Sequence, residues 1–314
     1  MVSGTNQITN PDLSVVILTY NVREMVLDCV ESVMQASDGL RVEIIVSDNC
    51  STDGTVEAVR ERYPDVFMVE NTENLGYAAG NNRGIEVSRG RHVLILNPDT
   101  VVDKDALRFT LEYAESHPEC GVVGCRVLNP DGSVQQSWFA KWSLFQALWI
   151  GLGLQSVAPM VRIDGRRKFT REPPDRAVQV DRLLGCFLWI RRDVIDRVGM
   201  FDEDFFLYGE EEDLCQRVRD AGLEVHYYPG VDTVHYGGQS TKHVKEWARI
   251  EANVSKVLWM KKHRGAAETL VFRIIWSFFL IIRVLFRLPL GLINRYHRSI
   301  MNAEIRSVRR IWVV

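Results

Sequence analysis

The amide of Asn97 and the carboxylate of Asp99 follow directly after the apolar run His92–Leu96. The run is almost entirely apolar and has no turn signal, which is typical of a strand buried on both faces in a parallel sheet. Pro98 ends the strand, because proline has no N–H to donate to the ladder. A carboxylate at this end of a buried strand lies where open α/β sheets bind ligands. A simple Asx-turn between Asp99 and Thr100 explains the same residues, and this stretch alone leaves both open.

Two earlier apolar runs end in the same way. Leu13–Thr19 is followed by Tyr20-Asn21, and the run 42–46 leads to Asp48-Asn49. The carboxyl ends of parallel strands lie along one edge of a sheet, so these polar side chains are expected near Asn97 and Asp99. Three converging polar loops are hard to explain by structural need and indicate a binding site.

Two further groups could act as a proton acceptor or a ligand. Glu210 to Asp213 are four acids in a row at the start of an amphipathic helical pattern. Such a run is by default a solvated helix face that suits the helix dipole, but it can also hold a general base at a pocket. His235 precedes a Gly-Gly pair, in a predicted loop that can approach a ligand closely. A lone histidine is more often structural, so its case depends on the acids elsewhere.

The elements that must position these residues alternate as strand, loop and helix through the first hundred residues. This order predicts an α/β fold with a parallel, doubly wound sheet. Further strands are expected at 121–128, 183–190 and 225–228. The aromatic-rich segment 138–159 is either a core helix or a flap facing an acceptor or membrane, and the basic segment 161–176 is predicted to be a loop. A dinucleotide-binding Rossmann enzyme and a P-loop NTPase are excluded, because neither glycine-rich motif follows the first strand.

The composition favours a globular protein in a reducing compartment. The six cysteines form no Cys-x-x-Cys pair, which indicates reduced thiols rather than a metal cage. The polar first eleven residues do not resemble a signal peptide. The net charge of −3 is unevenly distributed, because residues 261–314 carry 11 basic and two acidic side chains, while the rest of the chain has a net charge of −12. A basic tail on an acidic body predicts contact with an anionic surface.

The apolar stretch 269–295 lies within this tail. Arg273, Arg283 and Arg287 interrupt it and, at helical spacing, fall within about one third of the helix circumference with the other polar residues. This pattern predicts an interfacial helix with its arginines toward anionic lipid, kinked at Pro289. Packing on the domain or on a second subunit remains open, and a transmembrane span is less favoured than either.

Taken together, the motifs resemble glycosyltransferase family 2, the inverting nucleotide-sugar transferases, and in particular its rhamnosyltransferase-like branch. The matching segments span roughly residues 13–240 and read VVILTYN (15–21), SDNCSTDGT (47–55), NLGYAAGNN (74–82), LNPD (96–99), FFLYGEEEDL (205–214) and HYGGQS (235–240).

The resemblance implies a nucleotide-diphospho-sugar transferase fold of the GT-A type. It has a mostly parallel central sheet with helices on both faces, here followed by C-terminal amphipathic helices. Residues 1–10 would form a flexible tail, 11–241 the catalytic domain, and 242–314 a basic, helical, membrane-associating region.

The resemblance also implies residue roles. Asp48 would bind the nucleobase, and the donor site would further include Thr19, Tyr20, Asn21, Asn74 and Gly76. Asn97 and Asp99 stand at the family's Asp-x-Asp position, which binds a divalent metal and the diphosphate. Asn replaces the first acid, so Asp99 would carry most of the coordination, with His235 as an additional ligand.

The family's Glu-Asp pair falls on Glu210-Glu211, and its second member is the catalytic base. Glu211 adds one methylene of reach relative to the family's aspartate, and Glu210, Glu212 and Asp213 are the other candidates. A hard cation, Mg²⁺ or Mn²⁺, suits carboxylate ligands and a diphosphate leaving group.

The expected function is therefore metal-dependent, inverting sugar transfer in cell-envelope glycan synthesis. Rhamnose from dTDP-rhamnose is the expected donor sugar, and the acceptor would be lipid-linked or a polysaccharide. We expect a cytoplasmic protein, peripheral on the inner face of the cell membrane, with no nucleic-acid partner; homo-oligomerisation stays open. A catalytically inactive sugar-nucleotide-binding scaffold and a nucleotidyltransferase on the same fold are the alternatives.

Overall fold

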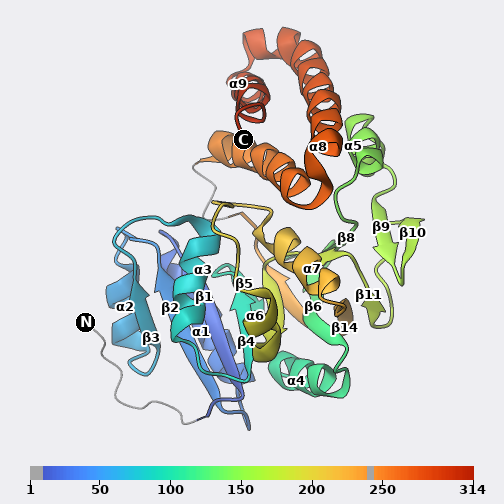
Figure 1. Ribbon diagram of the computed structural model, residues 1–314. Helices are drawn as coiled ribbons and strands as arrows, with labels where there is room; N and C mark the ends of the chain where they lie inside the picture. The colour runs from blue at the N-terminus through green and yellow to red at the C-terminus, as the bar shows by residue number, and fades with distance from the viewer. Residues whose placement is uncertain (1–9, 239–243) are drawn as a thin grey trace.

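A computed structural model describes residues 10–238 and 244–314 of the chain. A ten-stranded sheet forms its centre, in the order β11-β14-β6-β13-β4-β1-β2-β3, with β5 paired to β14 and β7 to β6. Helices cover both faces of the sheet, and a helical layer formed by the C-terminal region lies beyond one end of it (Figure 1). Except for Asn10, the expected N-terminal tail lies outside the described residues, as does the expected domain boundary at 241/242.

The N-terminal half of the sheet is parallel, as predicted. It consists of β1 (Leu13–Thr19), β2 (Val42–Asp48), β3 (Phe67–Glu70) and β4 (His92–Leu96). Every residue of β1 and β4 is buried, which explains their continuous apolar sequences. Alternate residues of β1 enter two separate cores: Val15 and Ile17 pack into one, and Val16 into the other.

Three helices pack on each face of this sheet. On the Val15 side lie α1 (Arg23–Ala36), α2 (Thr55–Arg62) and α4 (Ala106–Ser116). On the Val16 side lie α3 (Gly76–Val87), α6 (Arg192–Val198) and α7 (Glu210–Asp220). These helices bury their apolar faces against the strands, which gives the layered α/β fold expected.

The C-terminal half of the sheet is mixed. The strand β13 (Phe187–Arg191) is antiparallel to both β4 and β6 (Cys120–Leu128), whereas β14 (Glu224–His235) runs parallel to β6. The remaining short strands of this sheet are β5 (Thr100–Val102), β7 (Val134–Gln135) and β11 (Val178–Gln179). The prediction of a loop around His235 was wrong, because pairing with β5 and β6 extends β14 as far as His235.

Two other sequence predictions need correction. The basic segment 161–176 is not simply a loop, since β9 (Met160–Ile163) and β10 (Arg166–Phe169) form an antiparallel hairpin within it. The expected strand 183–190 is divided: β12 (Arg182–Leu183) pairs with β8 (Trp138–Phe139), and β13 pairs with the main sheet. Each half of that segment has a different partner, so an uninterrupted strand could not satisfy both.

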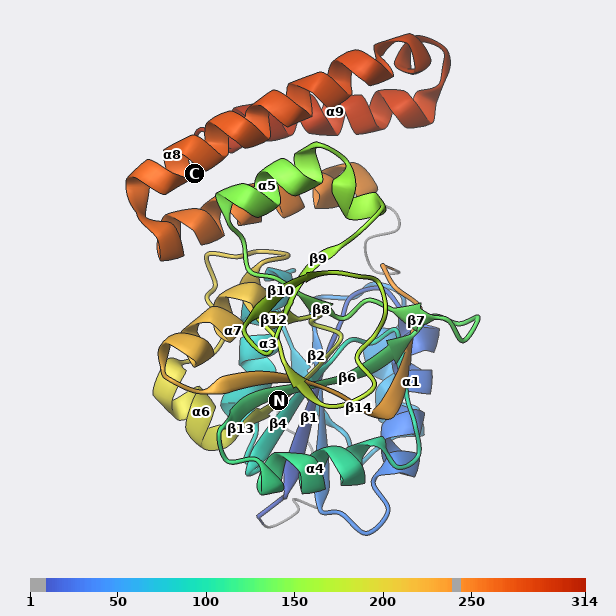
Figure 2. The same cartoon turned by 90° about the vertical axis from the view of Figure 1, so that its right-hand side faces the viewer.

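The C-terminal region forms a helical layer. Its helices are α8 (Lys245–Ile293), which turns sharply at Gly265, and α9 (Arg295–Arg310), which packs against α8. Gly265 has φ 76° and ψ 170°, a conformation open to glycine and unfavourable for other residues. The helix α5 (Leu144–Gly151), followed by a 3₁₀ turn (Leu154–Ser156), lies beside α8 (Figure 2). A third apolar core joins these elements.

The polar stripe of α8 contacts protein, contrary to the prediction that its arginines face lipid. Arg287 pairs with Glu304 of α9, Arg273 donates to the Val314 carbonyl oxygen, and Arg283 donates to the Ile150 carbonyl oxygen. Burial of these polar contacts against α9 and α5 leaves apolar side chains facing outward. Phe278 is 57% exposed and Phe286 80%. Pro289 also lies inside α8. Among the described residues of this helix, only Gly265 has non-helical backbone angles, so these angles show no break at Pro289.

Helix α8 is also long and apolar enough to cross a membrane by length and composition, and one third of its most apolar stretch is buried within the protein.

Candidate active site

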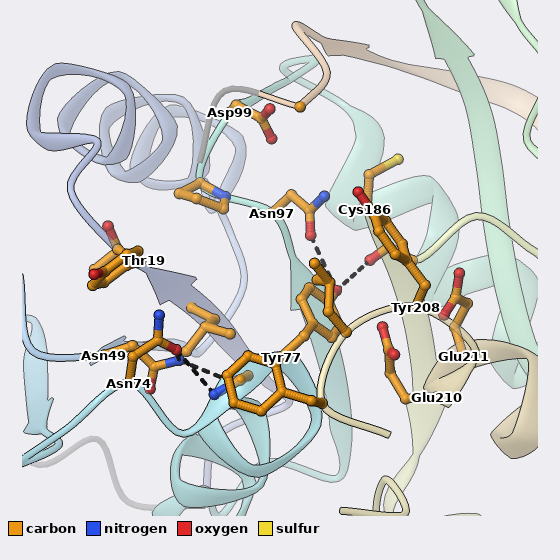
Figure 3. A pocket seen from close by; sticks show the side chains of 18 of the residues that line it. Thr19, Asn49, Asn74, Tyr77, Asn97, Asp99, Cys186, Tyr208, Glu210 and Glu211 are labelled. Carbon is orange, nitrogen blue, oxygen red and sulfur yellow. Dashed lines mark hydrogen bonds between the residues drawn. The ribbon is translucent and has the colours of Figure 1, made fainter. Parts of the chain in front are cut away.

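A cavity of about 250 Å³ lies at the carboxyl ends of β1 and β4, where the sequence predicted the polar loops to converge. Thr19, the last residue of β1, and Asn97, the residue after β4, line it, and the acidic end of α7 lines another side. Figure 3 shows Asp99 and Asn97 at one end of the pocket, Thr19 and Asn74 on one side, and the two glutamates of α7 on the other. Side chains from three distant segments of the chain therefore face one space.

Asp99 and His235 form the corner of the pocket that could hold a cation. His235 Nε2 lies 3.3 Å from Asp99 Oδ1 and 3.5 Å from the Asn97 side-chain nitrogen. On the other side of the ring, Nδ1 lies 2.7 Å from Gln135 Oε1. An amide oxygen only accepts hydrogen bonds, so Nδ1 must donate its proton to Gln135. In the neutral imidazole, the lone pair of Nε2 then faces the Asp99 carboxylate, as in a metal-binding histidine held by an outer partner.

These donors fit a divalent metal that is completed by substrate. The described residues contain no group of three or more His, Cys, Asp or Glu side chains placed to hold a metal ion. Mg²⁺ and Mn²⁺ are commonly bound by one or two carboxylates, with substrate phosphates and waters filling the remaining positions. Asp99 and His235, with the Asn97 amide beside them, suit that mode and do not suit a closed protein cage.

The Tyr77 hydroxyl fixes the orientation of Asn97. It lies 3.0 Å from Asn97 Oδ1 and 2.9 Å from the Gly185 carbonyl oxygen. Burial, together with the negative charges of Glu210 and Glu211, raises the pKa of Tyr77 well above its ordinary value. The hydroxyl therefore keeps its proton and remains a donor.

Glu210 and Glu211 begin α7 and are both buried, at 3% and 9% exposure. The left-handed conformation of Gly209, with φ 95°, turns the chain into the helix, and the Gly209 N–H donates to Glu211 Oε2 at 3.2 Å. Burial, followed by the charge of Glu211, raises the pKa of Glu210 well above 4.5. Burial, followed by the charge of Glu212, also raises the pKa of Glu211. Raised pKa values are typical of carboxyls that accept or donate protons in a reaction.

The other two acids of the run point away from the pocket. Glu212 pairs with Arg182 and accepts a hydrogen bond from the Trp142 indole, which links α7 to the segment before α5. Asp213 accepts from Arg217 at 2.7 Å and pairs with His263 at 2.8 Å. Burial opposes ionisation of Asp213, but these two partners hold its pKa below the ordinary value. The structure therefore does not bring Asp213 to the pocket.

Six of the eight residues expected at the donor site line the cavity: Thr19, Tyr20, Asn74, Gly76, Asn97 and Asp99. Asp48 and Asn21 lie outside its lining. Asn21 Oδ1 accepts from the Thr52 N–H at 2.8 Å and holds the following loop in place. Asp48 is 2% exposed; its Oδ2 accepts from the Ser51 N–H, and its Oδ1 is buried without a partner within the described part of the chain. Asp48 Oδ1 is thus an acceptor near the carboxyl end of β2, but Asp48 is not part of the cavity lining.

Several pocket residues were not singled out as site residues from the sequence. Tyr77 and Asn49 lie within or beside quoted motifs, which is a signal that could have identified them. Asn49 Nδ2 donates to the Gly76 carbonyl oxygen at 2.8 Å and shapes the loop before α3. Trp247, which lines the cavity from α8, had no such signal because only the tertiary fold brings it there.

Comparisons with known proteins identify the family of the chain. The family model described as "Glycosyl transferase family 2" matches residues 14–199. A relative from Mycobacterium tuberculosis, N-acetylglucosaminyl-diphospho-decaprenol L-rhamnosyltransferase, is 32% identical over 64% of this chain and 68% of its own length. Rhamnosyltransferase WbbL from Escherichia coli is 27% identical over 51% of this chain and 61% of its own length.

A solved mannosyltransferase from Pyrobaculum calidifontis, in complex with GDP-Man and Mn²⁺, shares the fold. Its TM-score is 0.58 at 17% identity, with 97% of this chain and 88% of that chain covered.

The chain belongs to glycosyltransferase family 2, in its rhamnosyltransferase-like branch, and has the GT-A fold expected. It is a glycosyltransferase, and sugar transfer in glycan synthesis is its activity. This result sets aside the inactive scaffold and the nucleotidyltransferase.

Proposed function

We propose that this enzyme transfers rhamnose from dTDP-rhamnose to a lipid-linked sugar diphosphate, with inversion at the anomeric carbon and with Mg²⁺ or Mn²⁺. The names of two relatives support rhamnose, and one of them names an N-acetylglucosaminyl-diphospho-decaprenol acceptor. The bound Mn²⁺ of the mannosyltransferase that shares the fold supports a divalent metal.

The proposal rests on one observation: the same pocket has possible metal ligands in one part and two buried glutamates in another. Asp99 and His235 stand where a diphosphate and its metal would be held, and Glu210 and Glu211 line the pocket from α7 (Figure 3). A single displacement needs its leaving group and its proton acceptor on opposite sides of the reacting carbon. This separation suits that geometry without a covalent intermediate.

The polar residues in and beside the pocket would then have separate tasks. Asp99 and His235 would hold the metal, with the Asn97 amide beside them, and the metal when bound would neutralise charge on the departing diphosphate. Asp48 would accept a hydrogen bond from the base through its unpartnered oxygen. Glu211 would take the proton of the acceptor hydroxyl as that oxygen attacks. Burial and the charge of Glu212 raise the pKa of Glu211, which favours proton acceptance by this carboxylate.

We further propose that the protein works at the cytoplasmic face of the cell membrane, held there by residues 242–314. Helix α8 exposes many large apolar side chains, such as Ile274, Phe278, Leu285 and Phe286, which water does not favour. The net charge of +9 over residues 261–314 suits an anionic membrane surface. A lipid-linked acceptor would reach the pocket from that surface.

A donor screen combined with product analysis tests the proposal. Thermal shifts of the full chain would be measured with dTDP-, UDP- and GDP-sugars in the presence of Mg²⁺ or Mn²⁺, with EDTA as the control. We expect a shift with dTDP-rhamnose that EDTA removes; a ligand at about 100 times its Kd adds about 2.7 kcal/mol.

Transfer to a polyprenyl-diphosphate-linked N-acetylglucosamine should invert the anomeric configuration, as read by NMR. A UDP- or GDP-sugar as the only donor turned over, or retention of configuration, would overturn the proposal.

A further inference from the structure

A second cavity, of about 370 Å³, lies between the β9–β10 hairpin, the segment leading into α5, and α8 just before its turn. It adjoins a smaller one of about 280 Å³, with which it shares Arg162 and Asp181. Five basic residues line the two: Lys141, Arg162, Arg167, Arg219 and Arg264. Asp181 is the only acid among the described residues that line them. None of these residues lines the donor pocket.

The hairpin places two of these cations directly opposite each other. Arg162 on β9 and Arg167 on β10 are cross-strand partners, so both project from the same face of the hairpin. Like charges in this position destabilise a strand pair. Within the described residues neither guanidinium pairs with a carboxylate: Arg162 Nε donates to the Gly165 carbonyl oxygen, and Arg167 lies over the Phe145 ring at 4.3 Å. An anion between them would remove the repulsion.

The remaining cations add to this excess of positive charge. Asp181 is already engaged, because it accepts from Arg219 at 2.9 Å and from the Lys141 backbone N–H at 3.1 Å. Arg264 forms an ion pair with Glu268 at 3.5 Å, although its Nε is buried without a hydrogen-bond partner within the described chain. Burial and the charge of Arg219 lower the pKa of the Lys141 ammonium. The cavity thus has more donors than acceptors, and arginines bind phosphate oxygens in pairs of hydrogen bonds.

An apolar surface begins where this basic cavity ends. Phe145, which stacks under Arg167, lies in the first turn of α5. Phe145, Leu148 and Leu152, the residue just after the helix, are 40%, 41% and 65% exposed. Both views place α5 above the hairpin and beside α8 (Figures 1 and 2). A ligand that fills the cavity and covers this surface would carry a phosphate and an apolar chain on one molecule.

We propose that this cavity binds the phosphate group of an anionic membrane lipid, with the lipid chains lying against the exposed face of α5. The site would orient the protein on the bilayer, because it adds a specific phosphate contact at α5 to the general attraction of the basic tail. This proposal rests on the proposed attachment of the protein to the membrane but not on sugar transfer. A wild type that does not bind anionic vesicles would overturn both that attachment and this site, whereas equal losses in the two variants described below would overturn this site alone.

Vesicle binding by two matched double variants of the full chain tests the site. R162Q/R167Q removes the two facing arginines of the cavity. R166Q/K168Q removes the same charge from the same hairpin. All four side chains are exposed, but Arg166 and Lys168 alternate onto the other face of the hairpin and do not line the cavity. Affinity would be measured for phosphatidylcholine vesicles with and without phosphatidylglycerol.

A basic residue near an anionic surface contributes about 1 kcal/mol without any specific site, so both variants lose that general term. We expect R162Q/R167Q to bind phosphatidylglycerol vesicles at least about tenfold more weakly than R166Q/K168Q does, which corresponds to about 1.4 kcal/mol. Equal losses in the two variants would overturn the proposal, because they would mean that only net charge matters.

Soluble ligands distinguish a lipid phosphate from free phosphate. Short-chain phosphatidylglycerol below its micelle concentration should raise the unfolding midpoint of the wild type but not that of R162Q/R167Q. Inorganic phosphate at the same concentration should raise the wild-type midpoint less. An equal or larger rise with inorganic phosphate would overturn the assignment to a lipid.

Discussion

Replacing Lys256 by methionine should change the pH dependence of stability. Lys256 lies in α8 and is partly buried; its Nζ donates to the Ala252 carbonyl oxygen and lies 5.4 Å from the Trp142 ring centre and 5.6 Å from that of Trp276. Burial lowers the pKa of this lysine from 10.5 to about 8, although the charge of Glu212 opposes the change. The methionine chain has nearly the same shape, so the substitution removes the charge and keeps most of the packing.

The expected sign follows from proton binding. Between about pH 8 and pH 10.5 the unfolded chain holds the Lys256 proton and the folded protein does not, so raising the pH through this window stabilises the fold. A pKa lowered from 10.5 to about 8 corresponds to about 3 kcal/mol at 1.36 kcal/mol per pH unit. Below pH 8 the buried ammonium contributes a constant cost.

Urea denaturation of the wild type and K256M at pH 7 and pH 10 measures this effect. The difference between the unfolding free energies of the two proteins cancels the contributions of the other titrating groups. From pH 7 to pH 10, the unfolding free energy of the wild type should rise by about 2–3 kcal/mol relative to that of K256M. K261M, at an exposed lysine of the same helix, is the control and should show the same difference from wild type at both. If the unfolding free energies of wild type and K256M differ by the same amount at both pH values, within about 0.5 kcal/mol, the lowered pKa of Lys256 is refuted.

Two further substitutions probe the pocket itself. E210Q should stabilise the ligand-free protein at pH 7 by about 1–3 kcal/mol, because Glu210 Oε2 is buried without a partner in the described structure and ionising this carboxyl is unfavourable. Urea titrations should show the gain vanish as the pH falls below 4.5, where the carboxyl is protonated in both the folded and the unfolded state. A gain that does not change with pH would argue against this cause. G76A should destabilise by about 2–3 kcal/mol and weaken donor binding in calorimetry, since φ is +84° and a Cβ would lie 2.4 Å from the Phe206 carbonyl oxygen. Wild-type stability and affinity in G76A would contradict the close approach of these two loops.

The parallel half of the fold was predictable because its signals are local. The strands β1 and β4 begin and end where their apolar runs do. Of the polar residues that follow them, Tyr20, Asn97 and Asp99 line the pocket as expected, whereas Asn21 does not. A carboxylate after a buried strand can be located from the sequence, because the sheet fixes where the strand ends.

The remainder depended on contacts between distant segments. The antiparallel insertion of β13 between β4 and β6, and the extension of β14 to His235, arise from pairing across more than fifty residues. No local sequence pattern predicts which distant strands pair with each other. The same limit applies to the acid run, since helical geometry alone does not say that Glu211 faces the pocket while Asp213 turns to His263.

The tail was misread for a related reason. Its arginines do share one face of α8, as their spacing predicts, but that face packs on α9 and α5. The composition of each face follows from helical spacing, whereas only the partner helices decide which face is outward.

The rate of sugar transfer by E211Q tests the central claim most directly. With Glu211 as the base, kcat should fall by about 10²–10⁴-fold while the Kd for the donor stays unchanged, since the amide cannot take the acceptor's proton. E211D, with the shorter carboxylate typical of the family, should recover part of that rate, and the wild-type rate should rise with pH through the raised pKa of Glu211. An E211Q enzyme with near-wild-type kcat, or one in which E210Q alone abolishes turnover, would contradict the assignment.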